Sequence, residues 1–84
     1  MNCISLLKLW QDSNCDTIFI KGLARVNHKK EIITSSLILN KRQRIMLGEE
    51  LTSYEYIQRF YSDAIFEYCD NEDGVIHVKV LFNR

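Results

Sequence analysis

The side chains best suited to bind a transition metal are three cysteines and two histidines. They are Cys3, Cys15, His28, Cys69 and His77. A structural zinc site usually contains pairs of ligands only a few residues apart, because a short loop must bring two donors to one ion. None of the five is paired in this way, so the sequence predicts no metal site and no cofactor. We expect Cys3 and Cys69 to be small core residues and His28 to lie in a turn.

Nucleophilic catalysis by a thiol requires a nearby base and surroundings that favour the thiolate. Cys15 is followed by Asp16, and Cys69 is followed by Asp70, so an adjacent carboxylate disfavours the thiolate in both cases. The acidic cluster at residues 70–73 is expected in a solvated turn, where nothing arranges two carboxylates for acid–base catalysis. The sequence therefore predicts that the chain is not an enzyme.

Five basic residues in or beside two expected turns are suited to contact phosphate groups. They are Lys29, Lys30, Lys41, Arg42 and Arg44. Residues 1–46 carry eight Lys/Arg and three Asp/Glu, a balance of +5, and residues 47–84 carry three and eight, a balance of −5. Such an asymmetry can mark a nucleic-acid surface or an acidic interaction surface. Two other interpretations stay open, namely charge complementarity within or between molecules and the simple solvation of hairpin ends.

Hydrophobic periodicity indicates both helices and strands in the chain. We expect helices at residues 3–11 and 52–69, and strands at residues 17–26, 31–39, 44–47 and 75–82. Asn2 is the expected N-cap of the first helix. Gly22, inside the first strand, predicts a bulge or a close approach of two backbones.

The second helix carries the clearest local signal. Thr52 and Glu55 form the T-x-x-E pattern of a capping box, in which each side chain accepts a hydrogen bond from the other residue's backbone N–H. Apolar residues then recur at steps of three and four from Ile57 to Tyr68, which predicts one apolar stripe on a helix.

These elements predict an α+β fold with the order α-β-β-β-α-β, in which an antiparallel sheet has helices packed on one face. We expect residues 1–84 to form a single compact domain. The order of the first five elements is similar to that of double-stranded RNA-binding domains. Those domains begin their second helix with lysines, whereas this chain has Thr52-Ser53-Tyr54-Glu55 there, so the resemblance implies no shared function.

Composition indicates a folded, intracellular protein. The chain is 46% hydrophobic and 26% charged, which argues against disorder. Its apolar runs are too short to span a bilayer, and its first residues do not resemble a secretory signal. We therefore expect a cytoplasmic location without membrane contact.

Two sets of residues are candidates for binding another protein. Tyr56, Arg59, Asp63 and Phe66 trace a second line along the expected long helix, with aromatic residues at both ends. Phe19 and Leu23 are expected on the outer face of the sheet together with Val75 and Leu81. Exposed apolar clusters of this kind often mark contact surfaces.

The sequence thus favours a small, non-enzymatic binding protein that acts through protein–protein contacts as a regulator, an inhibitor or an accessory subunit. A homodimer through the sheet face or an edge strand stays open. The alternative is a nucleic-acid-binding accessory protein that uses the basic hairpin turns.

Overall fold

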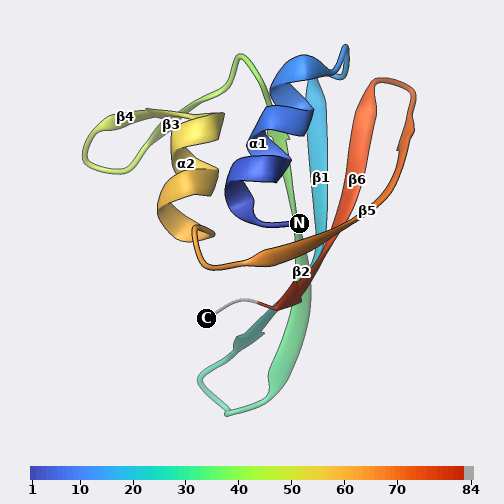
Figure 1. The fold of residues 1–84 in the computed structure, drawn as a ribbon. Coiled ribbons are helices and arrows are strands. Elements are labelled where there is room, and N and C mark those ends of the chain that lie inside the picture. The colour runs from blue at the N-terminus through green and yellow to red at the C-terminus, as the bar shows by residue number, and fades with distance from the viewer. Residues whose placement is uncertain (83–84) are drawn as a thin grey trace.

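The computed structural model describes the backbone of residues 1–82 and the side chains of residues 1–22 and 26–81. Its elements are α1 (Cys3–Asp12), β1 (Thr17–Val26), β2 (Ile32–Asn40), β3 (Arg44–Met46), β4 (Glu50–Thr52), α2 (Ser53–Phe60), β5 (Ile65–Glu72) and β6 (Val75–Phe82). Four strands form one sheet in the order β2-β1-β6-β5, and β3 and β4 form a separate ribbon (Figure 1). The predicted α+β class and succession of elements are confirmed, and β4 and β5 are additional strands.

The four-stranded sheet is mixed. β1 pairs with β2, and β5 with β6, in antiparallel fashion, but the two central strands β1 and β6 run parallel. The prediction of an antiparallel sheet is therefore corrected for the central pair, because β1 and β6 are parallel. A parallel pair requires a long crossover connection, and the chain from β2 through α2 to β5 supplies one.

Helix α1 forms where the sequence predicts it, and it packs against the sheet. Its N-cap is Asn2, whose side-chain oxygen accepts a hydrogen bond from the Ser5 amide at 2.8 Å. Cys3, Leu6 and Trp10 recur at helical spacing and are all buried, so one face of the helix enters the core.

The core lies between α1 and the inner face of the sheet. Ile18 of β1 is paired with Leu39 of β2 on one side and with Ile76 of β6 on the other. The buried sheet residues are Ile18, Ile20, Leu39, Phe66, Ile76, Val78 and Val80. Because side chains alternate along a strand, the residues between them point to the opposite, outer face.

Helix α2 ends at Phe60, so the expected helix over residues 52–69 is wrong beyond that point. Tyr61 caps the helix, residues 61–64 turn, and β5 begins at Ile65. The structure favours a strand here because β6 is buried and needs a second neighbour for its backbone N–H and C=O groups. Helix α2 therefore lies beside α1 rather than across the sheet (Figure 1).

Gly22 produces the irregularity that the sequence predicts. The pairing of β1 with β2 shifts register between Ile20 and Leu23, and Gly22 has a φ of +81°. A Cβ atom at this position would lie 3.3 Å from the backbone oxygen of Val80. Both the left-handed backbone and the close approach of β6 therefore require glycine.

Candidate protein-binding surface

The outer face of the four-stranded sheet carries a row of apolar and aromatic side chains. In the strand register, Phe19 of β1 lies between Ile38 of β2 and His77 of β6. Ile38 is 58% exposed and Leu81 is also exposed, whereas Phe19, Val75 and His77 are half-buried. Both helices lie on the other side of the sheet (Figure 1). Within the described part of the chain, no element covers this row.

The centre of this face is held together by ring contacts. The rings of Phe19 and His77 have centroids 5.6 Å apart and are tilted by 44°. The ammonium group of Lys21 lies 5.7 Å from the centroid of the Phe19 ring, within the range of a cation–π contact. Cross-strand pairs of this kind stabilise a sheet and restrict its side chains. The face is thus an ordered surface with an aromatic centre.

Charged residues flank the aromatic row in an uneven pattern. Lys21 and Lys79 are register partners on the two central strands, and they add positive charge beside the Phe19–His77 row. β5 contributes carboxylates at its edge, because Glu67 is paired with Lys79 and Asp70 with His77. Part of the acidic excess of residues 47–84 therefore lies along the edge strand β5.

His77 contributes a polar atom to the same face. Its Nδ1 atom is buried and makes no hydrogen bond to any residue whose side chain is described. Buried polar atoms in proteins usually have a hydrogen-bond partner. His77 thus places a buried polar atom without a hydrogen-bond partner among the described residues beneath this face of the sheet.

The predicted line of residues along the second helix does not exist. Tyr56 and Arg59 do lie on α2, but Asp63 lies in the turn after it. Phe66 is 1% exposed on β5 and packs in the core, so its expected role at a surface is wrong. The side chain of Leu23 lies outside the described residues.

Two aromatic residues of α2, Tyr56 and Phe60, instead cluster with Tyr61, the C-cap of the helix. The Tyr56 ring centroid lies 4.9 Å from that of Phe60 and 6.3 Å from that of Tyr61. Phe60 is 49% exposed, whereas Tyr56 packs partly against the core. Arg59 forms an ion pair with Glu49. This cluster is a second apolar surface, on the helix-bearing side of the molecule.

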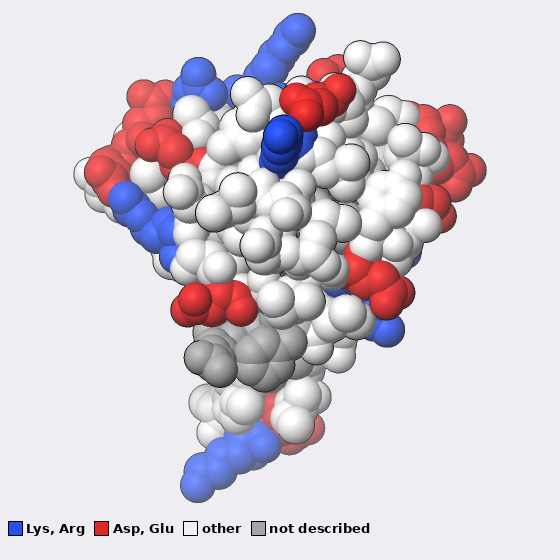
Figure 2. Space-filling view, viewed as in Figure 1, with Lys and Arg blue, Asp and Glu red and all other residues white. Residues whose placement is uncertain are grey.

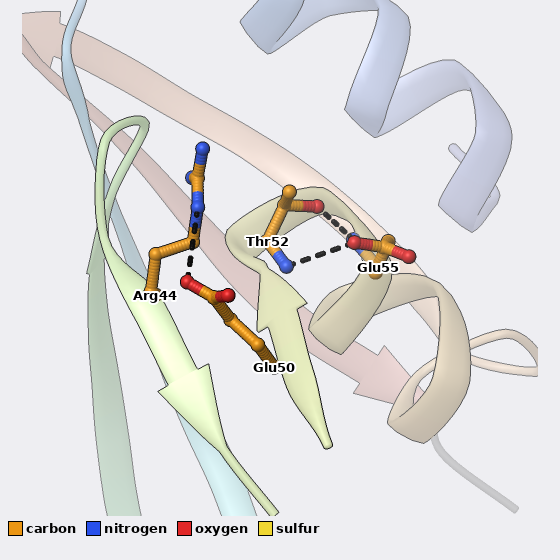
Figure 3. Close-up of polar contacts among 4 residues, drawn as sticks. All are labelled: Arg44, Glu50, Thr52 and Glu55. Carbon is orange, nitrogen blue, oxygen red and sulfur yellow. Dashed lines mark hydrogen bonds and ion pairs between the residues drawn. The ribbon is translucent and has the colours of Figure 1, made fainter.

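The β3–β4 ribbon and the start of α2 are joined by polar contacts (Figure 3). Arg44 of β3 forms an ion pair with Glu50 of β4 at 3.6 Å, and both side chains are exposed. The predicted capping box is confirmed. The Thr52 amide donates to the Glu55 carboxylate at 2.9 Å, and the Glu55 amide donates to the Thr52 hydroxyl at 3.1 Å.

The capping box leads to a prediction about pH. The hydrogen bond from the Thr52 backbone, followed by that from its side chain, lowers the pKa of Glu55 below the ordinary value of 4.5. Because this pKa is lower in the folded chain, the carboxylate stabilises the fold above the unfolded-state pKa, and this contribution is lost as pH falls through the folded-state pKa. An NMR titration of the Glu55 carboxyl carbon should give a midpoint below 4.5. Thr52→Ala should raise this midpoint. A wild-type midpoint at or above the ordinary value would contradict the lowering of the Glu55 pKa by hydrogen bonds from Thr52.

The five basic residues do not form one surface. Lys29 and Lys30 are exposed at the tip of the β1–β2 hairpin, which projects at the bottom of Figure 1 and carries a blue extension in Figure 2. Lys41, Arg42 and Arg44 follow the other end of β2. Nine residues of strand separate the groups by about 30 Å at the usual rise per residue. Lys41 is half-buried and donates to the Ser13 carbonyl at 2.9 Å, and Arg44 is paired with Glu50.

The thiols are placed differently from one another. Cys3 is buried in the core as predicted, and burial raises the pKa of its thiol, which disfavours the reactive thiolate. Cys15 is also buried. Cys69 is exposed on β5, so its expected place in the core is wrong. Among the described residues, no group of three or more His, Cys, Asp and Glu is placed to bind a metal ion.

Comparison of the chain with protein-family models, curated proteins and solved structures found no match. In the part of the chain that the structure describes, no helix is long and apolar enough to cross a membrane.

Proposed function

We propose that the chain is a non-enzymatic binding protein that uses the outer face of its sheet to contact another protein. The observation that supports this proposal is the row Ile38–Phe19–His77, which is apolar and aromatic at its centre and is covered by no described element. Aromatic centres with a charged rim are typical of protein–protein interfaces. A cytoplasmic regulator, inhibitor or accessory subunit is the class that fits this proposal.

The experiment compares two aromatic truncations on opposite sides of the molecule. Tagged wild-type protein, Phe19→Ala and Phe60→Ala would be used for affinity capture from the native host, with captured proteins quantified by mass spectrometry. We expect Phe19→Ala to lose the specific partner and Phe60→Ala to retain it, because Phe19 is central to the outer face and Phe60 lies on α2. Circular dichroism would confirm that both variants are folded.

Two results would overturn this proposal. Loss of the partner with Phe60→Ala and retention with Phe19→Ala would transfer the function to the α2 cluster. Salt-sensitive binding of labelled RNA or DNA that is lost when Lys29 and Lys30 are both changed to Glu would support the nucleic-acid alternative instead.

A further inference from the structure

The two edges of the four-stranded sheet differ in how well they are protected from pairing with another strand. An edge strand presents unpaired backbone N–H and C=O groups, and proteins usually protect such edges with charges, bulges or covering segments. At the β5 edge, the Phe66 amide donates to the Met1 carbonyl at 2.7 Å, and Asn2 forms a bridge to Ile65. β5 also contains two register shifts and several carboxylates. This edge is therefore protected along much of its length.

Among the described residues, the β2 edge has none of these protections over residues 32–39. β2 reads IITSSLILN, nine residues without a charge, a proline or a glycine. The register shift in the β1–β2 pair arises at Gly22 of β1, so β2 itself is regular. Its outward-facing residues are exposed, and Ile32 is 77% exposed. The last residue of β2 is occupied on this side: the Asn40 amide donates to the Gln43 side-chain oxygen at 3.2 Å, and the Asn40 carbonyl accepts from the Ser53 hydroxyl at 2.6 Å. No described strand pairs along the outer side of β2.

We propose that β2 pairs with β2 of a second copy of this chain, antiparallel about a twofold axis at Ser36. This inference concerns the strand edge, and it is independent of the function proposed for the outer face. The register places Thr34 opposite Ile38 of the other copy and Ile33 opposite Leu39, so that apolar and β-branched residues meet on each face. Two sheets thereby become one continuous eight-stranded sheet.

Charge complementarity selects this register and this occupant. In the proposed pairing, Glu31 of one copy lies opposite Lys41 of the other, and the symmetry produces this contact twice. Shifting the axis to a neighbouring residue places Glu31 or Lys41 opposite an uncharged residue. Glu31 is exposed, and the Lys41 ammonium group has donors left beyond its bond to the Ser13 carbonyl. Each ion pair therefore takes one residue from each copy, and a second copy supplies the missing partner of both.

The proposed assembly also closes. A twofold interface uses the same strand in both copies, so neither copy has a β2 edge left over. The remaining edges of the joined sheet are the two β5 strands, which are the protected ones. We therefore expect a dimer and no larger species.

The experiment measures mass and cross-linking on the whole chain. Light scattering after gel filtration should show a concentration-dependent change from monomer to dimer. In a Cys69→Ser background, which removes the exposed native thiol, Ser36→Cys should form a covalent dimer on mild oxidation. Opposed residues in an antiparallel pair have Cα atoms about 4.5–5.5 Å apart, within the range that a disulfide spans.

Thr34→Cys is the matched control. In the proposed register, Thr34 of the two copies is separated by four residue rises, about 13 Å, which no disulfide spans. Ser36→Lys should raise the dissociation constant of the dimer about fivefold, because it places like charges opposite each other. Ser62→Lys, at an exposed serine in the turn before β5, should leave it unchanged.

Three results would overturn the dimer. They are a monomer at every concentration, an open-ended series of larger species, and equal cross-linking by Ser36→Cys and Thr34→Cys. A monomer that still captures its partner in a Phe19-dependent manner would leave the proposed function intact. A dimer that captures nothing would support the dimer alone, so the two failures are distinguishable.

Discussion

Phe66→Ala is expected to lower the free energy of unfolding by about 3–5 kcal/mol, the usual cost of removing a buried phenylalanine side chain. Phe66 is 1% exposed, and it lies opposite Val80 in the pairing of β5 with β6. Its removal leaves a cavity between α1 and the sheet, which surrounding residues fill only in part. Urea denaturation followed by circular dichroism would measure the change.

Phe60→Ala is the matched control, because it makes the same change at a residue that is half exposed at the end of α2. We expect Phe60→Ala to lower the free energy of unfolding by less than about 1 kcal/mol, because a partly exposed side chain loses less buried area. The free energy of unfolding of Phe66→Leu should lie between those of the two alanine variants. If residues 52–69 formed one helix, Phe60 would lie on its apolar, core-facing stripe and Phe66 on its solvent side. Phe60→Ala would then lower the free energy of unfolding more than Phe66→Ala, and that reversed order would contradict β5.

The second large effect is expected at Trp10. Trp10→Ala should destabilise the fold by about 3–5 kcal/mol, because the indole is fully buried and fills the space between α1, the sheet and α2. Its Nε1–H donates to the Cys15 carbonyl at 3.1 Å, and its ring centroid lies 4.8 Å from that of Tyr54. A domain of this size is stable by only about 4–13 kcal/mol, so this variant would lose a large part of its stability.

Trp10→Phe distinguishes the contribution of packing to stability from that of the hydrogen bond. It keeps an aromatic ring but leaves the Cys15 carbonyl without its donor, a change that costs about 1–3 kcal/mol when the acceptor is buried. Ile4→Ala, on the exposed side of the same helix, should have almost no effect. Thermal and urea unfolding would rank the three variants. Equal losses of stability in Trp10→Ala and Ile4→Ala would show that α1 does not pack as described.

Local signals in the sequence predicted local structure well. The Thr52–Glu55 pattern, the Asn2 cap and the Gly22 irregularity are all present, because each depends on backbone geometry within a few residues or at a single glycine. The alternation along β1 and β6 also identified the outer face with Phe19 and Val75. The partner that this face binds stays a prediction.

The end of the second helix was predicted wrongly for a physical reason. Ile65 and Tyr68 fit a helical stripe as well as they fit a strand, and no glycine or proline separates them from α2. Tertiary pairing with β6 decides the outcome. One signal favoured the strand. Asp73-Gly74, with φ values of 54° and 78°, joins β5 and β6 in a tight turn, and Asp-Gly between apolar strands is a strong indication of a hairpin.

The parallel pairing was beyond the reach of sequence patterns. Whether β6 lies beside β1, and in which direction, depends on how helices and strands pack across most of the chain. The same limit applies to the surface line through Phe66. It required a helix of 18 residues, whereas the structure has one of eight.

The parallel central pair determines when the fold can form during synthesis. β1 is made early and β6 last, and the 42 residues from Lys41 to Phe82 separate the end of β2 from the end of β6. At about 5–20 residues per second, a ribosome needs roughly 2–8 s to complete them. Throughout that interval the nascent β1–β2 hairpin has neither its parallel neighbour nor a completed core. We therefore expect nascent chains to associate prematurely through this hairpin, and slower growth at low temperature with an added chaperone should increase the soluble yield.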